Sequence, residues 1–590
     1  MEINYNQISF SSLTTAFLAL GFFKSIVVYC EAIKSKKKVT EKKTKQIELW
    51  IASYSTFTSV VTFVGFCTET YYYGARLLMN LVAISMGYIL SFMFLQPFFY
   101  DMDITSVYEY LQKRYGNRVI MRVITTSFGI LFRFSFATLF LWTNATILTT
   151  LFPQCELYIA IIVIGCLSAI YALIGGLIQI MYVSLLQIVI FFIGTLCALS
   201  SAITLPDGKL TYYWNLALQN NRLKFIETAG DFTTRYTIWN QLFSVPLTWC
   251  TFHALLTPQI IRYKQIKSKD TSSLFMISHL PIMFLINTAS VFCGIFIYIT
   301  FNDCDPYLSQ KIVNKNQIAT YFLITVLDKT LPSVAGLSLA VLFSYGILQN
   351  AFGLNFSVQI FITDILKPIY AANKKEIKEK HLLILRPILV FIISIISVFY
   401  AFSFQYLKSS ILSLFFFMNA SIHAPMTGLI FLSIFNPYAN HVGALITYII
   451  AIVVNIWLGI GSITTSLVNT KSQEFIQNTD GCSNSSVLRV LNTNATYIPE
   501  NQILYNMYTF SSVWFSLFDF IFIIVFGSLI SLIYSLISKR RLDYDLEYKN
   551  QRKKYLFNFR RDFVFTDLCP RKNIEETAET TKDASSGTRL

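Results

Sequence analysis

Charged residues are scarce in this sequence. Asp, Glu, Lys and Arg make up only 13% of its 590 residues, against about 25% in an average soluble domain, while 54% are hydrophobic and 16% aromatic. So few charges cannot cover the surfaces of the several soluble domains that a chain of this length would form. The 10 cysteines are too sparse for a disulfide-stapled secreted scaffold, and the apolar composition excludes an intrinsically disordered chain. The composition is that of a polytopic membrane protein.

Motifs of catalysis and cofactor binding are also missing. The sequence has no Walker loop and no GxGxxG, CxxC, HExxH or GxSxG pattern. Its five histidines are scattered, at positions 253, 279, 381, 423 and 441, whereas a membrane di-iron enzyme needs them clustered at helical spacing. We therefore expect neither an enzyme nor a cofactor, and the movement of a solute remains as the function.

Long apolar runs are abundant instead. A helix needs about 20 apolar residues to cross the hydrocarbon core of a bilayer. Runs between polar breaks predict an all-α polytopic protein with thirteen spans, at 8–30, 49–73, 76–99, 119–151, 157–174, 179–204, 236–256, 273–301, 333–363, 382–405, 409–434, 442–468 and 509–537. The weakest of these predictions are 49–73 and 236–256, which are rich in Ser, Thr, Trp and Tyr.

The basic residues predict the orientation. They gather in the segments 34–45, 262–269, 367–380 and 539–561, which all fall on one side of the membrane if the chain crosses it thirteen times. The positive-inside rule makes that side cytoplasmic, so the N-terminus is extracellular and the C-terminus cytoplasmic in a multi-pass plasma-membrane protein. The net charge of +15 then follows from topology, and no nucleic-acid partner is implied.

The predicted loop 469–508 offers a further check on this orientation. Asn484 and Asn494 open two glycosylation sequons there, on the side predicted to be outside. Cys304 and Cys482 also fall in outside loops, where they either pair or remain unrelated thiols.

Polar residues within the spans are the candidate site residues, because ionisable groups at bilayer depth are costly. Arg133 lies 14 residues into its span, roughly 21 Å along the helix. It is either an anion-attracting charge beside a cavity or a structural Arg that pairs with carbonyls or snorkels. The second span carries six Ser or Thr between positions 53 and 62, which favours a broken helix over packing through small polar residues. Glu69 is expected near the outer face, where water solvates it.

With these segments placed, the chain resembles the sodium:solute symporter family, in the branch of the sodium-dependent multivitamin, monocarboxylate and iodide transporters. The similarity covers about 45–465 and is carried by short motifs in family order: Ile104 to Leu111 before Arg114-Tyr115, Tyr171 to Leu177 with Gln187, Leu331-Pro332, Gly336-Leu337, Leu342 to Ser344, Thr363-Asp364 before Lys367-Pro368, Pro425, Gly428-Leu429, Asn436-Pro437, and Trp457 to Ser462. Each motif is weak alone, and the ordered set is specific.

This resemblance implies a LeuT-like core of two inverted five-helix repeats within 49–434. Residues 1–48 then form an extra helix and a basic loop, residues 435–538 add two C-terminal helices, and residues 539–590 form a cytoplasmic tail. Substrate would sit at the midplane beside the broken second and seventh spans.

The resemblance also suggests site residues, listed here by role. Substrate contacts are predicted for Thr58, Thr62, Arg133, Trp239 and Gln259, and a sodium site for carbonyls of Ser55 and Thr58 together with the ninth span. The family's paired hydroxyls fall on Leu348 and Gln349, so of these two side chains only Gln349 offers an oxygen. A Trp-Thr-Asp motif becomes Tyr182-Val183-Ser184, and an Asn-Gln pair becomes Leu255-Leu256.

The predicted function is therefore sodium-coupled symport of a small organic solute by alternating access. Arg133 favours an anion such as a monocarboxylate or a vitamin. The alternative is a sodium-independent facilitator or a non-transporting sensor on the same fold, because the sodium-site hydroxyls are lost.

Overall fold

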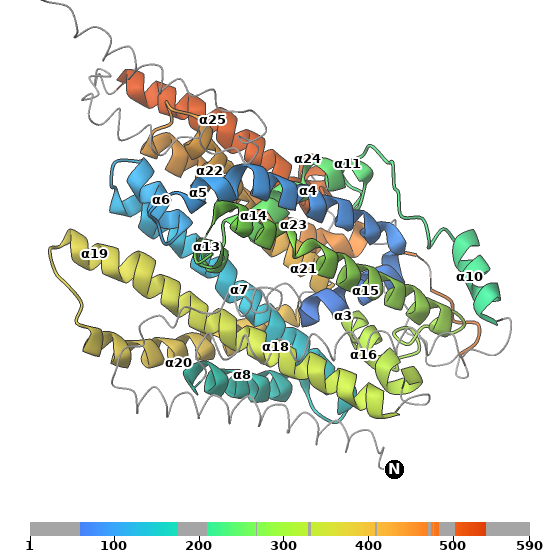
Figure 1. The fold of residues 1–590 in the computed structure, drawn as a ribbon. Helices are drawn as coiled ribbons and strands as arrows, with labels where there is room; N and C mark the ends of the chain where they lie inside the picture. The colour runs from blue at the N-terminus through green and yellow to red at the C-terminus, as the bar shows by residue number, and fades with distance from the viewer. Residues whose placement is uncertain are drawn as a thin grey trace, which may run out of the picture.

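The computed structural model describes residues 59–174, 209–266, 268–327, 332–406, 410–469, 474–475, 477–482 and 502–537, and the regular elements in these ranges are helices (Figure 1). Eight described segments are long and apolar enough to cross a bilayer: Ala75–Tyr100, Val119–Leu151, Lys269–Phe301, Val334–Ala372, Glu379–Phe404, Ile411–Phe435, His441–Ser462 and Ser512–Ile537. Leu157–Leu173 is a shorter apolar helix. The all-helical prediction is confirmed. The count of thirteen is not, because the predicted spans 8–30 and 179–204 lie outside the described residues.

The α-helices follow the predicted spans closely. In chain order they are α3 (Val60–Tyr73), α4 (Asn80–Leu90), α5 (Gln96–Tyr100), α6 (Val107–Arg114), α7 (Val119–Leu151), α8 (Leu157–Ile174), α10 (Lys209–Gln219), α11 (Ile238–Phe243), α12 (Val245–Ala254), α13 (Thr257–Lys264), α14 (Lys269–Ile277), α15 (Leu280–Phe301), α16 (Ile318–Phe322), α18 (Pro332–Ile360), α19 (Lys367–Ala372), α20 (Glu379–Phe404), α21 (Ile411–Met418), α22 (Ala424–Phe435), α23 (His441–Asn469), α24 (Gln502–Tyr508) and α25 (Phe515–Ile537). Two of them, α7 and α8, begin and end at the predicted residues.

The described part of the second span begins at Ser59. This residue is extended, with φ −149° and ψ 151°, and α3 begins immediately after it. The Ser59 hydroxyl accepts a hydrogen bond from the Thr62 amide and so caps the first turn of α3. The hydroxyl-rich sequence thus supplies the side chain that satisfies the helix end.

The apolar run predicts the seventh span at 236–256, and the family resemblance implies that this span is broken. The seventh span consists of α11, α12 and α13, with Leu256 extended (φ −64°, ψ 128°) between the last two. Pro246 and Pro258 lie in the first turns of α12 and α13, where a missing N–H leaves no helical hydrogen bond unmade. The polar, proline-containing sequence therefore breaks this span.

Three π-helical segments each precede a proline by two residues. These are η2 (Ser91–Leu95) before Pro97, η5 (Phe361–Leu366) before Pro368 and η6 (Asn419–His423) before Pro425. Because proline has no N–H, the carbonyl that would accept from it loses its helical donor, and the wider π turn accommodates this loss. A further π segment, η4 (Leu323–Leu327), and the 3-10 turns η1 (Ala75–Met79), η3 (Lys315–Gln317) and η9 (Ser512–Trp514) complete the described elements.

Helix packing repeats with a period of five spans. Helix α3 packs along α15 and α4 along α12, while α7 packs along α18 and α8 along α20. In the predicted span numbering these pairs are 2 with 8, 3 with 7, 4 with 9 and 5 with 10. If spans 2–6 correspond to spans 7–11, the pair 2 with 8 corresponds to the pair 7 with 3. The pairs 4 with 9 and 5 with 10 correspond to themselves. Two inverted repeats require this pattern. Figure 1 shows α7, α18, α20 and α8 together on one side.

The helix pairs approach closely at glycines. A Cβ built on Gly353 of α18 would lie 2.6 Å from the Ala137 Cβ of α7, and one built on Gly87 of α4 would lie 2.6 Å from the Trp249 Cβ of α12. Small residues at such crossings allow backbones to pack tightly in a membrane.

The two ends of the bundle differ. At the disulfide end, Cys304 is bonded to Cys482, which settles the two alternatives in favour of pairing. The backbone supports this contact, since the Asp305 amide donates to the Asn478 carbonyl (3.0 Å) and the Gly481 amide to the Asp303 carbonyl (2.9 Å). The basic end carries α6, α13 and α19 with the predicted basic loops 262–269 and 367–380.

Candidate solute and ion sites

Aromatic side chains from three predicted membrane spans meet inside the bundle. This central aromatic cluster consists of Phe132 and Phe136 of α7, Trp249 and Phe252 of α12, Phe415 of α21 and His423 of η6. Its ring centroids lie 5.3 Å apart for Phe136 and Phe415, 5.8 Å for Trp249 and Phe252, and 6.2 Å for Phe136 and Phe252. The cluster therefore joins the fourth, seventh and eleventh predicted spans.

The cluster keeps some accessible surface although it lies in the interior. Phe136, Phe252 and Phe415 are each 9% exposed and Trp249 is 8% exposed, whereas their neighbours Leu139, Cys250 and Leu414 are at most 1% exposed. An apolar ligand surface buried against such rings gains about 25 cal/mol per Å². These rings therefore leave apolar surface accessible within the bundle.

Arg133 places a positive charge beside this cluster. It follows Phe132 on α7, and its guanidinium carbon lies 5.3 Å from the centroid of the Phe356 ring. One turn earlier, the Tyr108 hydroxyl packs over Gly129. Arg133 is buried and has no ion pair with a carboxylate of the described residues. Both predicted roles of Arg133, attraction of an anion and a structural role, stay predictions.

His423 is a polar member of the cluster that sequence reasoning missed. Its ring stacks on Phe132 at 4.6 Å, and its Nδ1 atom has no hydrogen-bond partner among the described residues. A lone histidine in an apolar run carries no periodic signal. The only local sign is Pro425, two residues later, which accompanies the π turn that holds His423.

The other predicted substrate residues are spread more widely. Thr62 lies in the first turn of α3 and bonds to Ser59 (2.9 Å between hydroxyls), and Gln259 is buried in α13. Trp239 is 46% exposed on α11 and has no ring contact with the cluster, so the structure does not bring it to the other residues. Trp249 lies there instead, and its indole N–H donates to Asn80 Oδ1 (3.1 Å).

The predicted sodium and glycosylation residues are only partly described. Ser55, Thr58, Asn484 and Asn494 lie outside the described residues. Leu348 is buried on α18 and Gln349 is partly buried.

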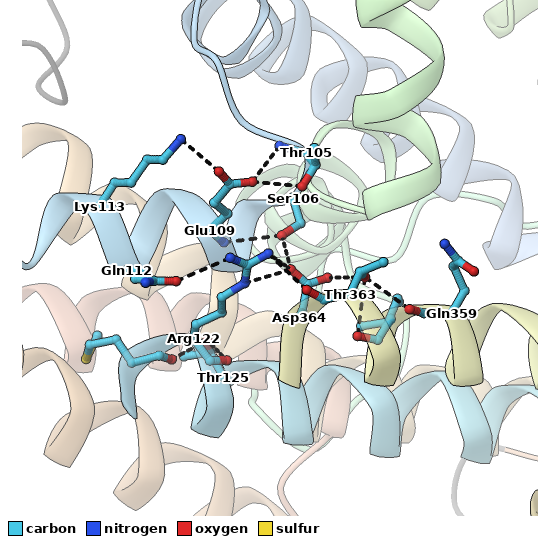
Figure 2. Close-up of polar contacts among 12 residues, drawn as sticks. Thr105, Ser106, Glu109, Gln112, Lys113, Arg122, Thr125, Gln359, Thr363 and Asp364 are labelled. Atoms are coloured by element: carbon cyan, nitrogen blue, oxygen red, sulfur yellow. Dashed lines mark hydrogen bonds and ion pairs between the residues drawn. The ribbon is translucent and has the colours of Figure 1, made fainter. Parts of the chain in front are cut away.

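At the basic end, two of the sequence motifs meet. Figure 2 shows Asp364 of η5 receiving hydrogen bonds from Ser106 and Arg122. Asp364 Oδ1 accepts from Ser106 Oγ at 2.6 Å and from Arg122 Nε and Nη2 at 2.9 and 2.6 Å. Ser106 also caps α6, so one carboxylate ties α6, α7 and η5 together.

At the disulfide end, Glu69 makes a second buried link. The expectation that water solvates Glu69 is wrong: its side chain is 1% exposed. Glu69 Oε1 accepts from Arg235 Nη1 (2.8 Å) and Tyr236 (3.1 Å), and Oε2 accepts from the Ser410 hydroxyl (2.7 Å). This carboxylate connects α3 with the segment before α11 and the start of α21.

Comparison with known proteins gives matches along most of the chain. The sequence profile of the sodium:solute symporter family matches residues 44–451. The chain is 23% identical to sodium-coupled monocarboxylate transporter 1 of Homo sapiens over 515 residues, covering 86% of this chain and 82% of that protein. It is 23% identical to the sodium-dependent multivitamin transporter of Oryctolagus cuniculus over 536 residues, covering 90% and 82%. Among solved structures, a Na⁺-coupled sialic acid symporter in a substrate-bound outward-open state has the same fold, with TM-score 0.63 and 17% identity over 90% of this chain and 98% of that one.

Proposed function

The chain belongs to the sodium:solute symporter family, and on that premise we propose that it carries a small organic anion across the membrane by alternating access, with weakened coupling to sodium. The observation that carries this proposal is the central aromatic cluster with Arg133 beside it, in a bundle that also holds α3, capped at Ser59, and the seventh span, interrupted at Leu256. Interrupted spans expose backbone groups that bind solutes and ions in transporters of inverted repeats.

The anion is inferred from the chemistry of this site. A guanidinium is always charged and matches the two oxygens of a carboxylate. The aromatic rings suit the short apolar part of the same molecule. A monocarboxylate or a carboxylate vitamin has both features, and the names of two relatives describe such solutes.

Weakened sodium coupling is inferred from Leu348. The resemblance assigns the sodium site to carbonyls of Ser55 and Thr58 and to positions 348 and 349, where only Gln349 has a side-chain oxygen. A cation stripped of water needs several oxygen ligands. One coupled charge supplies about 2.3 kcal/mol per 100 mV, or roughly fiftyfold accumulation, and a site that binds sodium poorly loses this driving force.

The orientation is part of the proposal. We place the basic end in the cytoplasm and the disulfide end outside, in a multi-pass plasma-membrane protein. The Glu69 link then helps to close the outer side and the Asp364 link the inner side, and the two would loosen in alternation.

Uptake into proteoliposomes tests the proposal. Labelled lactate and a labelled carboxylate vitamin are offered with and without an inward sodium gradient, beside a labelled cationic amine of similar size. The proposal predicts uptake of an anion, no uptake of the amine, and a small increase with sodium. Failure to take up any anion would remove the proposed substrate class.

A second candidate is a sodium-independent facilitator or a non-transporting sensor on the same fold. The loss of a hydroxyl at Leu348 favours it, because such a protein needs no ion site. Equal final uptake with and without sodium identifies the facilitator, and a ligand-dependent rise in melting temperature without flux identifies the sensor.

A further inference from the structure

Asp519 is a buried carboxylate in a part of the protein that the proposed mechanism does not use. It lies on α25 at the level of Asn455, which is halfway along α23, and its side chain is 5% exposed. A carboxylate at this depth is costly and marks a functional site by default.

The hydrogen bonding around Asp519 is sparse. Its Oδ2 accepts from Asn455 Nδ2 at 2.7 Å, which is its one side-chain hydrogen bond among the described residues. An ionised carboxylate has about four acceptor positions, so one neutral amide leaves its charge largely uncompensated.

The elements packed against α25 bring no cation to Asp519. These are mainly α12, α22, α23, η6 and η9, and their buried titratable side chains are Cys250, His253, His423 and Tyr448. His441, at the start of α23, contacts Tyr534, about four turns beyond Asp519 on α25. Asp519 forms no ion pair with a described residue. Within the described part of the chain, only a cation from solution is left to neutralise the carboxylate.

The surrounding groups favour a proton over a metal ion. Sodium needs several oxygens within reach, but the nearest partner of Asp519 is an N–H donor, which repels a cation. The Ala420 carbonyl nearby already accepts one hydrogen bond, from the same Asn455 amide at 3.2 Å. A proton needs only the carboxylate oxygen itself.

Asn455 also connects Asp519 to the central aromatic cluster. In η6 the Ala424 amide bonds to the Asn419 carbonyl, five residues back. The residue five positions after Ala420 is Pro425, which has no N–H. The Ala420 carbonyl therefore has no donor within the π turn and accepts from Asn455 instead. His423 of the cluster lies in the same π segment. On α25, Ser516 lies one turn before Asp519 and bonds to Thr248, which precedes Trp249.

We propose that Asp519 is an intramembrane proton-binding site whose occupancy is coupled to movement of the interrupted seventh and eleventh spans. A proton from water converts the carboxylate to a neutral carboxylic acid, and its release restores the charge. Loss of the negative charge weakens the hydrogen bond from Asn455 to Asp519. It thereby also changes the hydrogen bond from Asn455 to the Ala420 carbonyl. The coupling role rests on the proposed transport function, but the occupancy of the site does not.

Two measurements without a substrate test this proposal. Infrared difference spectra of the purified protein in lipid, taken at neutral and alkaline pH, should contain a protonated-carboxylic-acid C=O band that Asp519→Asn removes. An acid jump on proteoliposomes adsorbed to an electrode should give a transient charge movement that the same variant abolishes. Asp480→Asn, which neutralises an exposed carboxylate, should leave both signals unchanged.

Each alternative outcome overturns the proposal. If no carboxylic-acid band depends on Asp519, the side chain is an ionised carboxylate. If the charge movement is the same in Asp519→Asn, Asp519 is a protonated acid that only stabilises the structure. A transient after a sodium jump that requires Asp519 identifies a sodium site instead. If Asp519→Asn does not fold, Asn455→Leu must shift the band, because it removes the hydrogen-bond donor of the acid. Failure of anion uptake would refute the proposed function and leave these signals untouched.

Discussion

Arg133 is held in the interior by the groups that share its part of α7. Phe132 stacks on His423, the Tyr108 hydroxyl packs over Gly129, and the guanidinium lies over Phe356. A charge at bilayer depth costs about 2.5–3.5 kcal/mol even by the lower scales. A ligand carboxylate that binds there, as we propose, would recover part of this cost.

Arg133→Gln is expected to lower anion uptake about ten- to hundredfold, because it removes a charged hydrogen-bond donor that the anion needs. Initial uptake rates of labelled lactate in proteoliposomes measure the effect. Arg118→Gln, which neutralises an exposed arginine immediately before the same helix, is the control and should leave the rate unchanged. Equal rates in Arg133→Gln and wild type would assign Arg133 to structure.

Leu348→Ser combined with Gln349→Thr restores the two hydroxyls that the family resemblance expects. Accumulation driven by an inward sodium gradient should rise toward the limit of about fiftyfold per 100 mV for one coupled charge. The control is Leu339→Ser, an equally buried leucine two turns earlier on the same helix. An unchanged sodium response in the double variant would show that positions 348 and 349 do not form the ion site.

At the scale of elements, two buried carboxylates connect helices that are far apart in sequence. Asp364 joins α6, α7 and η5 through Ser106 and Arg122, and Glu69 joins α3 to α21 through Ser410. Removal of one partner from a buried ion pair leaves a charge without compensation, so these links are stability determinants at both ends of the bundle.

Asp364→Asn should lower the free energy of unfolding by about 3–5 kcal/mol, because Arg122 then keeps a charge without its partner. Thermal unfolding in detergent reports the change. Asp103→Asn, at an exposed position of the same end, should shift stability by no more than about 0.5 kcal/mol. The double variant Asp364→Asn with Arg122→Gln should be little less stable than Asp364→Asn alone. If the losses of unfolding free energy in the two single variants simply add in the double variant, the link between Asp364 and Arg122 is refuted.

Glu69→Gln is expected to destabilise the start of α21 locally. The Gln amide has no charge and cannot form an ion pair with Arg235. Its hydrogen bond with the Ser410 hydroxyl is weaker than that of the carboxylate by about 1–2 kcal/mol. Hydrogen exchange over residues 410–418 should therefore become faster, while exchange in α20 stays the same. Glu156→Gln, an exposed substitution between α7 and α8, is the comparison. Unchanged exchange at α21 would contradict this role of Glu69.

For the whole molecule, much of the fold follows from the sequence. Hydropathy and polar breaks place α7, α8, α20 and α23 within a few residues, because the bilayer requires long apolar helices and few other solutions exist. The start of α3 after Ser59 agrees with the hydroxyl-rich local composition.

The parts that sequence reasoning misses depend on contacts between distant segments. Glu69 looks solvated until Arg235, 166 residues later, is placed beside it. Asp519 and His423 are single polar residues in apolar runs, and their surroundings come from other helices. Trp239 and Trp249 are both tryptophans of the predicted seventh span, and the sequence does not show which ring faces the interior. In the structure the Trp239 ring is exposed and the Trp249 ring lies in the central aromatic cluster.

A cryo-EM structure of the protein in lipid with a bound organic anion, lactate or a carboxylate vitamin, tests the central claim most directly. The account predicts density for the anion between Arg133, His423 and the rings of Trp249 and Phe415, with a helix end at Ser59 and a helix break at Leu256. Density at another location, or a continuous helix through Ser59 and Leu256 with Arg133 facing lipid, would contradict it.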